Sequence, residues 1–510
     1  MRSGLDRPLN TSDAYAWLRA NSQEKSILSS IGELLAWDQR TVIPTGGHAH
    51  RARQLALVAK LVHQRGSDPR IGELLAIVDG SAVCADPSSP EAINIREWRR
   101  RYERARKVPE RLIVELAEAA ALSESAWEHA RPNNDWASFA EHLTRFVQLK
   151  REQAEALGYQ HEPYDALLEE YEPDLSTQQI EALFGVLRPA LVALLARIRG
   201  ARRRPNPAVL RGRFPRSKQE ALGREAATLI GYDFTRGRLD SSAHPFTMSA
   251  GPSDVRITTR YDKRYFPTAF FATLHEAGHA LYEQGLPAEH AGTPIGEPAS
   301  LGIHESQSRL WENLVGRSAS FWRYFLKRAQ GHCTALAGVS LDEFVFAVNG
   351  VEPSLIRVEA DEVTYNLHIV LRFELELLLL RGDLTVADLP AAWDEKMRSL
   401  LGILPPDAAS GVLQDVHWAS GAIGYFPTYT VGNLAAAQFF KQAQRDLGDL
   451  DRLFAIGDFA PFLDWLRRHI HAHGGRFWPR DLLRHVTGED LSPAGLIEHL
   501  DEKYTRLYKL

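Results

Sequence analysis

Apolar residues recur at spacings of three and four along most of the chain, which is the pattern of helices with one buried face. Residues 11–200 show this spacing with almost no strand-like alternation, and Leu, Ala, Arg and Glu fill the positions between. The spacing returns after residue 265 and continues to the C-terminus. It stops at glycines and prolines: Gly285-Leu286-Pro287, Gly382, Pro405-Pro406 and Gly474-Gly475. The pattern predicts a mainly α protein.

One segment departs from the helical pattern. Between Gly237 and Asp262, β-branched or aromatic residues alternate with polar ones. We expect two short strands there, one within His244 to Met248 and one within Asp254 to Tyr261, joined at Gly251-Pro252. The predicted fold is thus a large helical body with one small β-sheet near residues 243–261.

The length of 510 residues fits one large domain or two intimate ones. Two interruptions stand out, a turn at Ile43 to Gly47 and a basic stretch from Arg197 to Arg216, which we interpret as a surface linker. We expect a single domain over residues 1–510. Its parts would be a helical N-terminal part at about 11–200, a catalytic part at about 240–440 and a helical C-terminal part.

Composition and charge exclude several classes of protein. An apolar fraction of 44% and a charged fraction of 25% are typical of soluble globular chains rather than disordered ones. Sixty basic and 65 acidic residues give a net charge of -5, so we expect no nucleic acid or membrane partner. The most continuous apolar run, Leu377 to Leu380, is far shorter than a bilayer requires.

The two cysteines, Cys84 and Cys333, cannot form a disulfide framework, which favours a reducing compartment. The segment from Met1 to Thr11 lacks the apolar core of a secretory signal. We therefore expect a cytoplasmic protein.

The sharpest motif is His275-Glu276-Ala277-Gly278-His279. Pro267 and Gly285 predict one helix around it. A spacing of four brings His275 and His279 to one face, where both imidazoles can bind one zinc ion. Glu276 then lies beside the metal, where it can take a proton from an activated water. The alternative is a pair of helix histidines that only pack or cap, but Gly278 in mid-helix suggests a close approach to the backbone.

A catalytic zinc needs a third protein ligand and one position for water. Glu305 is the best candidate, because the 26 residues after His279 allow a loop and a returning helix. Glu305 and Arg309 are also i,i+4 partners, so an ordinary surface pair is the alternative. His304 competes as a ligand, but neighbouring side chains on a helix diverge by about 100°.

Six blocks of residues follow one another along the chain: His244-Pro245-Phe246, Asp254-Val255-Arg256-Ile257-Thr258, His275 to His279, His304-Glu305-Ser306-Gln307, Ile356 to Asp361, and Gly411 to Trp418. In kind and order they resemble the carboxypeptidase Taq family of zinc-dependent metallocarboxypeptidases. Weaker similarity at Trp37-Asp38-Gln39 and at Gly424 to Tyr429 extends the resemblance over about 400 residues. One departure is that Arg40 and Ile43 stand where the family has an acidic residue and a Met.

The resemblance implies a helical fold split by a deep groove, distantly like angiotensin-converting and thimet-type oligopeptidases, and usually a homodimer. It also implies that Arg357 binds the substrate's terminal carboxylate, for which the planar guanidinium is well suited. The alternative for Arg357 is a salt bridge to Glu359 or Asp361, and Arg256 is the second candidate for the anchor.

The same resemblance assigns residues around the scissile bond. Tyr425 is similar to a tyrosine that stabilises the developing oxyanion, and His417 to its neighbouring histidine. Tyr429, in the same segment, is placed with the substrate-binding residues. His244, held extended by the following proline, could hydrogen-bond the substrate backbone.

The leading hypothesis is a metallocarboxypeptidase that removes single residues from free peptide C-termini, with zinc as cofactor and cobalt or manganese as possible substitutes. An oligoendopeptidase or dipeptidyl carboxypeptidase with the same groove is one alternative. A catalytically silent helical scaffold is another, although the intact Glu276 argues against it because a structural zinc needs no base.

Overall fold

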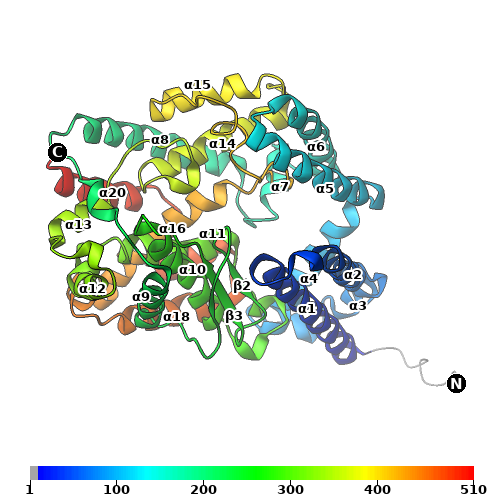
Figure 1. Ribbon diagram of the computed structural model, residues 1–510. Coiled ribbons are helices and arrows are strands. Elements are labelled where there is room, and N and C mark those ends of the chain that lie inside the picture. The colour runs from blue at the N-terminus through cyan, green and yellow to red at the C-terminus, as the bar shows by residue number, and fades with distance from the viewer. Residues whose placement is uncertain (1–9) are drawn as a thin grey trace.

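A computed structural model describes residues 10–510 and confirms the mainly α class (Figure 1). The segment tested for a secretory signal falls almost wholly within residues 1–9, outside the described residues. The first half of the chain contributes α1 (Thr11–Thr41), α2 (His48–Gly66), α3 (Pro69–Val78), α4 (Pro90–Lys107), α5 (Glu110–Asn133), α6 (Trp136–Leu157), α7 (Pro163–Leu168), α8 (Thr177–Gly200) and α9 (Arg216–Leu229).

The second half contributes the helices that carry the motifs. They are α10 (Pro267–Gly285), α11 (Leu301–Arg309), α12 (Ala319–His332), α13 (Leu341–Val348), α14 (Thr364–Arg381), α15 (Leu389–Leu401), α16 (Pro427–Leu447), α17 (Leu450–Ala455), α18 (Ala460–His469), α19 (Pro479–Thr487) and α20 (Ala494–Tyr508). A π-helical turn, η6 (Leu310–Val315), directly continues α11, and a short 3-10 turn, η8 (Arg357–Glu359), precedes α14.

The small sheet has three strands where the sequence predicted two. Strands β2 (Thr247–Ser249) and β3 (Val255–Thr259) pair antiparallel as expected, but β1 (Leu239–Ser241) pairs parallel to β3 on its other edge. A strand of three residues is too short to show alternation. The paired residues of β2 begin at Thr247, just after Phe246, whose oxygen accepts from the backbone N–H of Thr258. The sheet therefore spans residues 239–259 rather than 243–261.

The buried apolar residues form two clusters. The larger one runs from Ala130 to Tyr508 and surrounds α10, α11, α14 and α16. The smaller one joins α1, α3 and α4 around residues such as Leu18, Leu74 and Trp98. The N-terminal helices thus have a core of their own, while the helices with the motifs share the main core. The single domain over residues 1–510 stays a prediction.

Helix α8 changes two sequence expectations. It ends at Gly200, so the predicted linker begins after it rather than at Arg197, whose side chain pairs with Asp501 of α20. Its length and composition are those of a membrane-crossing helix, with 33% of the apolar window buried. This apolar window is longer than Leu377 to Leu380, but one such helix is weak evidence, because core helices of soluble proteins have the same composition.

Helix α10 lies at the centre of the arrangement, against α9, α11 and β3 (Figure 1). It begins at Pro267 and ends at Gly285, as predicted. A Cβ at Gly278 would lie 2.6 Å from the carbonyl oxygen of Gln307 and from Cα of Ser308. The close approach expected at this glycine is therefore the contact between the backbones of α10 and α11.

Candidate metal and substrate site

The two helices bring His275, His279 and Glu305 together. One ligand atom from each lies within 4.8 Å of the other two. Nε2 of His275 is 3.8 Å and Nε2 of His279 is 3.4 Å from Oε2 of Glu305. Two imidazole nitrogens and one carboxylate oxygen, joined by no fourth group from residues 10–510, are the donor set typical of a catalytic zinc. The residues present fit a metal with an open position.

Glu305 is buried and held from two sides. Arg309 donates from Nε to its Oε1 at 2.7 Å, which confirms the i,i+4 pair while leaving Oε2 toward the histidines. Burial alone would raise the pKa of Glu305, but Arg309, His275 and His279 together hold it far below its usual value. Gly432 of α16 faces this side chain, and a Cβ there would lie 2.6 Å from Cβ and Cγ of Glu305.

His275, His279 and Glu305 form a triad, and the Nδ1 atom of each histidine faces a partner outside it. Nδ1 of His275 lies 2.9 Å from Oε2 of Glu312. Nδ1 of His279 lies 2.6 Å from Nδ1 of His304, whose Nε2 is 2.9 Å from Oε1 of Glu283. His304 therefore supports His279 instead of facing the triad. These contacts leave both Nε2 atoms available for a metal.

Glu276 is buried beside the triad. The hydroxyl of Thr247, from β2, lies 2.7 Å from its Oε2 and 3.0 Å from its backbone oxygen. Burial raises the pKa of Glu276, although His275 and the Thr247 hydroxyl oppose the shift. A carboxylate with a raised pKa is a stronger base than an exposed one, which suits proton transfer near neutral pH.

Arg357 begins η8 and is only 5% exposed. Its Nε and Nη2 donate to Oδ1 of Asp415 at 3.1 and 2.9 Å. The alternative predicted for Arg357, a salt bridge to Glu359 or Asp361, is therefore wrong, because the partner is Asp415. Asp361 instead accepts from the backbone N–H of Thr364 at the start of α14, as an N-cap does. Chain proximity suggested those partners, but Asp415 comes from 58 residues away.

Asp415 also accepts a hydrogen bond from a second buried cation. Nε of Arg372, from α14, donates to its Oδ2 at 2.7 Å. The two guanidinium groups hold the pKa of Asp415 far below its usual value although burial would raise it. One carboxylate between two arginines leaves a net positive charge in a buried place, which favours an incoming carboxylate.

Tyr425 and His417, assigned to the scissile bond, lie together with the substrate-binding candidate Tyr429 beside Arg357. Nε2 of His417 is 3.3 Å from the hydroxyl of Tyr429, and the rings of Tyr425 and Tyr429 are 5.3 Å apart. Arg357 stacks over the Tyr429 ring at 4.9 Å. Burial, with the charge of Glu305, raises the pKa of Tyr425 to about 12, so its hydroxyl stays a donor at neutral pH. Tyr429 belongs to α16, which begins at Pro427, whereas Tyr425 lies two residues before that helix.

The two remaining candidates lie around the small sheet. Arg256, on β3, is held by Asp254 through two contacts of 2.7 Å and stacks over Trp37 at 4.8 Å. His244 is exposed and precedes β2. Within residues 10–510, no hydrogen bond or ion pair joins either residue to the triad. Arg357 is thus the better placed anchor.

Several supporting residues escaped the sequence reasoning. Glu312 offered a signal, since it follows Glu305 by seven residues, two helical turns on one face. Thr247 and Glu283 offered none, because their contacts depend on how β2 and α11 pack against α10. Asp415 stands in one of the six blocks, but nothing in the sequence indicated that it pairs with Arg357.

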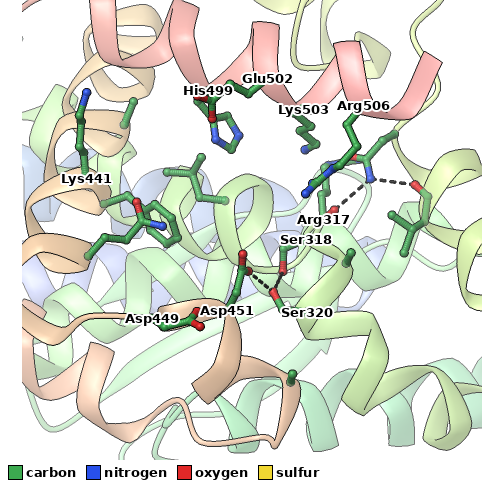
Figure 2. A pocket seen from close by; sticks show the side chains of 18 of the residues that line it. Arg317, Ser318, Ser320, Lys441, Asp449, Asp451, His499, Glu502, Lys503 and Arg506 are labelled. Carbon is green, nitrogen blue, oxygen red and sulfur yellow. Dashed lines mark hydrogen bonds between the residues drawn. The ribbon is translucent and has the colours of Figure 1, made fainter. Parts of the chain in front are cut away.

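A cavity of about 640 Å³ lies away from these residues, beneath α20 (Figure 2). Its wall includes the N-terminus of α12 and parts of α16 and α17, and its charges are mixed, with Arg317, Lys441, Asp451 and Lys503 among them. None of the predicted site residues lines it. Arg317 connects it to the triad region, because its Nη2 reaches Oε1 of Glu312 at 3.1 Å.

Comparison with known proteins gives one consistent answer. A family model described as carboxypeptidase Taq (M32) metallopeptidase matches residues 18–504. The chain is 54% identical to thermostable carboxypeptidase 1 of Thermus thermophilus over 97% of this chain and 99% of that one, and 38% identical to carboxypeptidase 1 of Bacillus subtilis over 94% and 95%. It superposes on the solved M32 carboxypeptidase of Deinococcus radiodurans with a TM-score of 0.94 and 39% identity, covering 98% of this chain and 100% of the other.

Proposed function

Because the chain belongs to the carboxypeptidase Taq (M32) family and is a carboxypeptidase of the metallopeptidase type, we propose that its metal is zinc held by His275, His279 and Glu305. The donor set supports zinc, with cobalt or manganese as possible substitutes. The substrates are peptides with a free C-terminus, shortened by one residue at each cycle.

The chain's own residues supply the other steps. Zinc, when bound, would lower the pKa of water and polarise the scissile carbonyl. Glu276 takes the proton of the attacking water and passes it to the departing amine, and Thr247 orients its carboxylate. Tyr425 donates from its hydroxyl to the oxyanion, and His417 and Tyr429 line the same place. Arg357 binds the terminal carboxylate.

The observation that carries this proposal is the burial of Arg357 within a network that has two cations for one carboxylate. Such a place accepts one more negative charge, and a peptide's C-terminus provides it. Tyr365 links the two regions, because its hydroxyl accepts from Arg357 while its ring lies 4.3 Å under Arg309, the partner of Glu305.

The decisive experiment compares peptides with free and amidated C-termini, incubated with the zinc-loaded protein and resolved by mass. We expect release of single amino acids from the free acids and little cleavage of the amides. Release of dipeptides would favour a dipeptidyl carboxypeptidase, and equal cleavage of both series would favour an endopeptidase. No cleavage of either series would favour a silent scaffold.

We also propose a homodimer, supported by apolar residues on the N-terminal helices. Helix α2 has no buried residue. Ile27 and Ile31 on α1, and Leu57 and Leu61 on α2, are 61%, 42%, 59% and 38% exposed. Each pair is four residues apart and so lies on one face of its helix. Light scattering should give a dimer for the wild type and a monomer for the variant Ile27→Glu/Leu57→Glu. A monomeric wild type would contradict this proposal.

A cytoplasmic location is likewise proposed. Cys84 and Cys333 are both free, as expected in a reducing compartment. Cell fractionation with detection of the chain in the soluble fraction tests it.

A further inference from the structure

Glu312 has no part in the mechanism above, although it is a buried acid in contact with a metal ligand. It lies on the π-helical turn η6, and its side chain is 13% exposed. Oε2 lies 2.9 Å from Nδ1 of His275 and 3.3 Å from Nη1 of Arg309, and Oε1 accepts from Nη2 of Arg317. Both oxygens are thus occupied by donors. Insertions of a π turn are frequent at functional sites, because they change where a helix aims its side chains.

The contact with His275 has a definite direction. Oε1 of Glu312 accepts from Nη2 of Arg317, and Oε2 lies 3.3 Å from Nη1 of Arg309, so both oxygens of this side chain act as acceptors. Nδ1 of His275 must therefore carry the hydrogen. The lone pair of a neutral imidazole is then on Nε2, the nitrogen that faces Glu305.

The two metal-site histidines differ in this respect. Nδ1 of His279 lies 2.6 Å from Nδ1 of His304 and 3.1 Å from the backbone oxygen of the same residue, and no carboxylate of the described chain meets it there. His275 meets a charged carboxylate directly. A charged acceptor forms the stronger hydrogen bond, so Glu312 fixes its ring more firmly than His304 can fix the ring of His279.

Arg317 holds Glu312 by donating to its Oε1, and it makes two further contacts that fix its own guanidinium. Its Nη1 donates to the carbonyl of Val348 at 2.7 Å, and its guanidinium lies 4.0 Å over the ring of Phe271. Phe271 stands one helical turn before His275 on α10. Figure 2 shows Arg317 on the cavity wall, and its hydrogen bond to Val348 connects this support to α13.

We propose that Glu312 is a positioning residue that fixes the ring orientation and the tautomer of His275 for metal binding, with Arg317 and Arg309 holding its carboxylate in place. This rests on the proposed zinc site. Glu312 does not touch the metal or the substrate. Its effect is that the lone pair of His275 points into the triad before any ion arrives.

The test measures zinc affinity, by competition with a chromophoric chelator, in Glu312→Ala, Glu312→Gln and the wild type. Loss of an outer partner of a metal-binding histidine weakens metal binding by about 10- to 100-fold, and we expect this for Ala. Gln should lose less, because its amide oxygen can still accept from Nδ1 but lacks the charge. Glu362→Gln is the matched control, since Glu362 is a buried acid paired with Lys503 and touches no residue of the triad. Its zinc affinity should equal that of the wild type.

A second readout separates positioning from folding. The melting temperature of each metal-free protein reports any general damage, and the rise on adding zinc reports the site. We expect the rise to shrink for both Glu312 variants and to persist for Glu362→Gln. If Glu312→Ala does not fold, the isosteric Gln variant decides the matter by the same measurement. Wild-type zinc affinity in the Glu312 variants would overturn the inference, whereas a wild type that binds no zinc would overturn the metal site itself.

Discussion

Nε of Arg309 lies 2.7 Å from Oε1 of Glu305, while Oε2 of the same carboxylate faces the two histidines. One oxygen is therefore occupied by the guanidinium and one is available to a metal. A zinc ion held through that one oxygen and the two histidines would keep room for water. Arg309, an i,i+4 partner of Glu305, thus determines which oxygen of Glu305 can bind a metal.

Replacing Glu276 by Gln should separate proton transfer from metal binding. The amide cannot take a proton, so turnover should fall by at least about 10²-fold. The triad is untouched, so about one equivalent of zinc should remain. Steady-state kinetics and metal analysis on the same preparation check both. Near-normal turnover would show that Glu276 is not the base.

Replacing Tyr425 by Phe should lower turnover with little change in the melting temperature. Removal of one oxyanion donor costs about 10²- to 10³-fold in kcat in known hydrolases. The ring keeps its contact with Tyr429, so the packing should persist. The matched control is Tyr159→Phe, whose hydroxyl contacts only Glu155 on the surface. If kcat is unchanged and only KM rises, Tyr425 binds substrate without stabilising the oxyanion.

Replacing Arg357 by Ala should affect free-acid peptides far more than amides. A charge-assisted bidentate contact contributes about 1.5 to 3 kcal/mol, so kcat/KM for free acids should drop roughly ten- to a hundredfold. The slow cleavage of amides should change little, and Lys should restore only part of the loss because it lacks the planar fork.

Arg256→Ala is the control for that comparison, because Arg256 is held by Asp254 near the sheet. Its ratio of acid to amide rates should match the wild type. If Arg357→Ala slows both substrates equally while Arg256→Ala changes the ratio, the anchor is Arg256.

The buried His471 should make the protein less stable in acid. Its Nε2 donates to Gln307 at 3.0 Å, and burial lowers its pKa to about 3, against an unfolded value of about 6.5. Below pH 6.5 the unfolded chain binds a proton at His471 and the folded chain does not. As the pH falls, this group therefore lowers the free energy of unfolding by about 1.4 kcal/mol per pH unit.

His471→Gln keeps a donor for Gln307 but cannot titrate. The dependence of the urea midpoint on pH between about 6.5 and 4 should therefore be shallower in the variant, with metal-free protein in both cases. Parallel curves for the two proteins would mean that His471 is protonated in the folded state.

The sequence predicted the residues that act through their own chemistry better than the residues that hold them. The bounds of α10 follow from Pro267 and Gly285, and its spacing of four places both histidines on one face. Glu305 follows from the need for a third ligand at a distance that allows a return helix. Each of these inferences uses local geometry alone.

The remaining residues depend on packing between distant segments. The carboxylate that pairs with Arg357 is 58 residues away, and the hydroxyl that contacts Glu276 comes from a strand 29 residues earlier. No local period encodes such contacts. Strand β1 was missed for a similar reason, since three residues beside β3 form a strand only because β3 offers its edge.

Glycines at the contacts between α10, α11 and α16 let these helices approach closely, and two of them lie next to the proposed metal site. Gly278 lets the backbone of α11 approach α10, and Gly432 lets the side chain of Glu305 rest against α16. At either position a single added carbon would meet atoms at 2.6 Å, with backbone at the first and the metal-binding side chain at the second. The catalytic centre can therefore be lost by substitutions that remove no functional group. A mutational survey restricted to acids, bases and histidines would pass over Gly278 and Gly432, where we expect an added methyl group to lower activity.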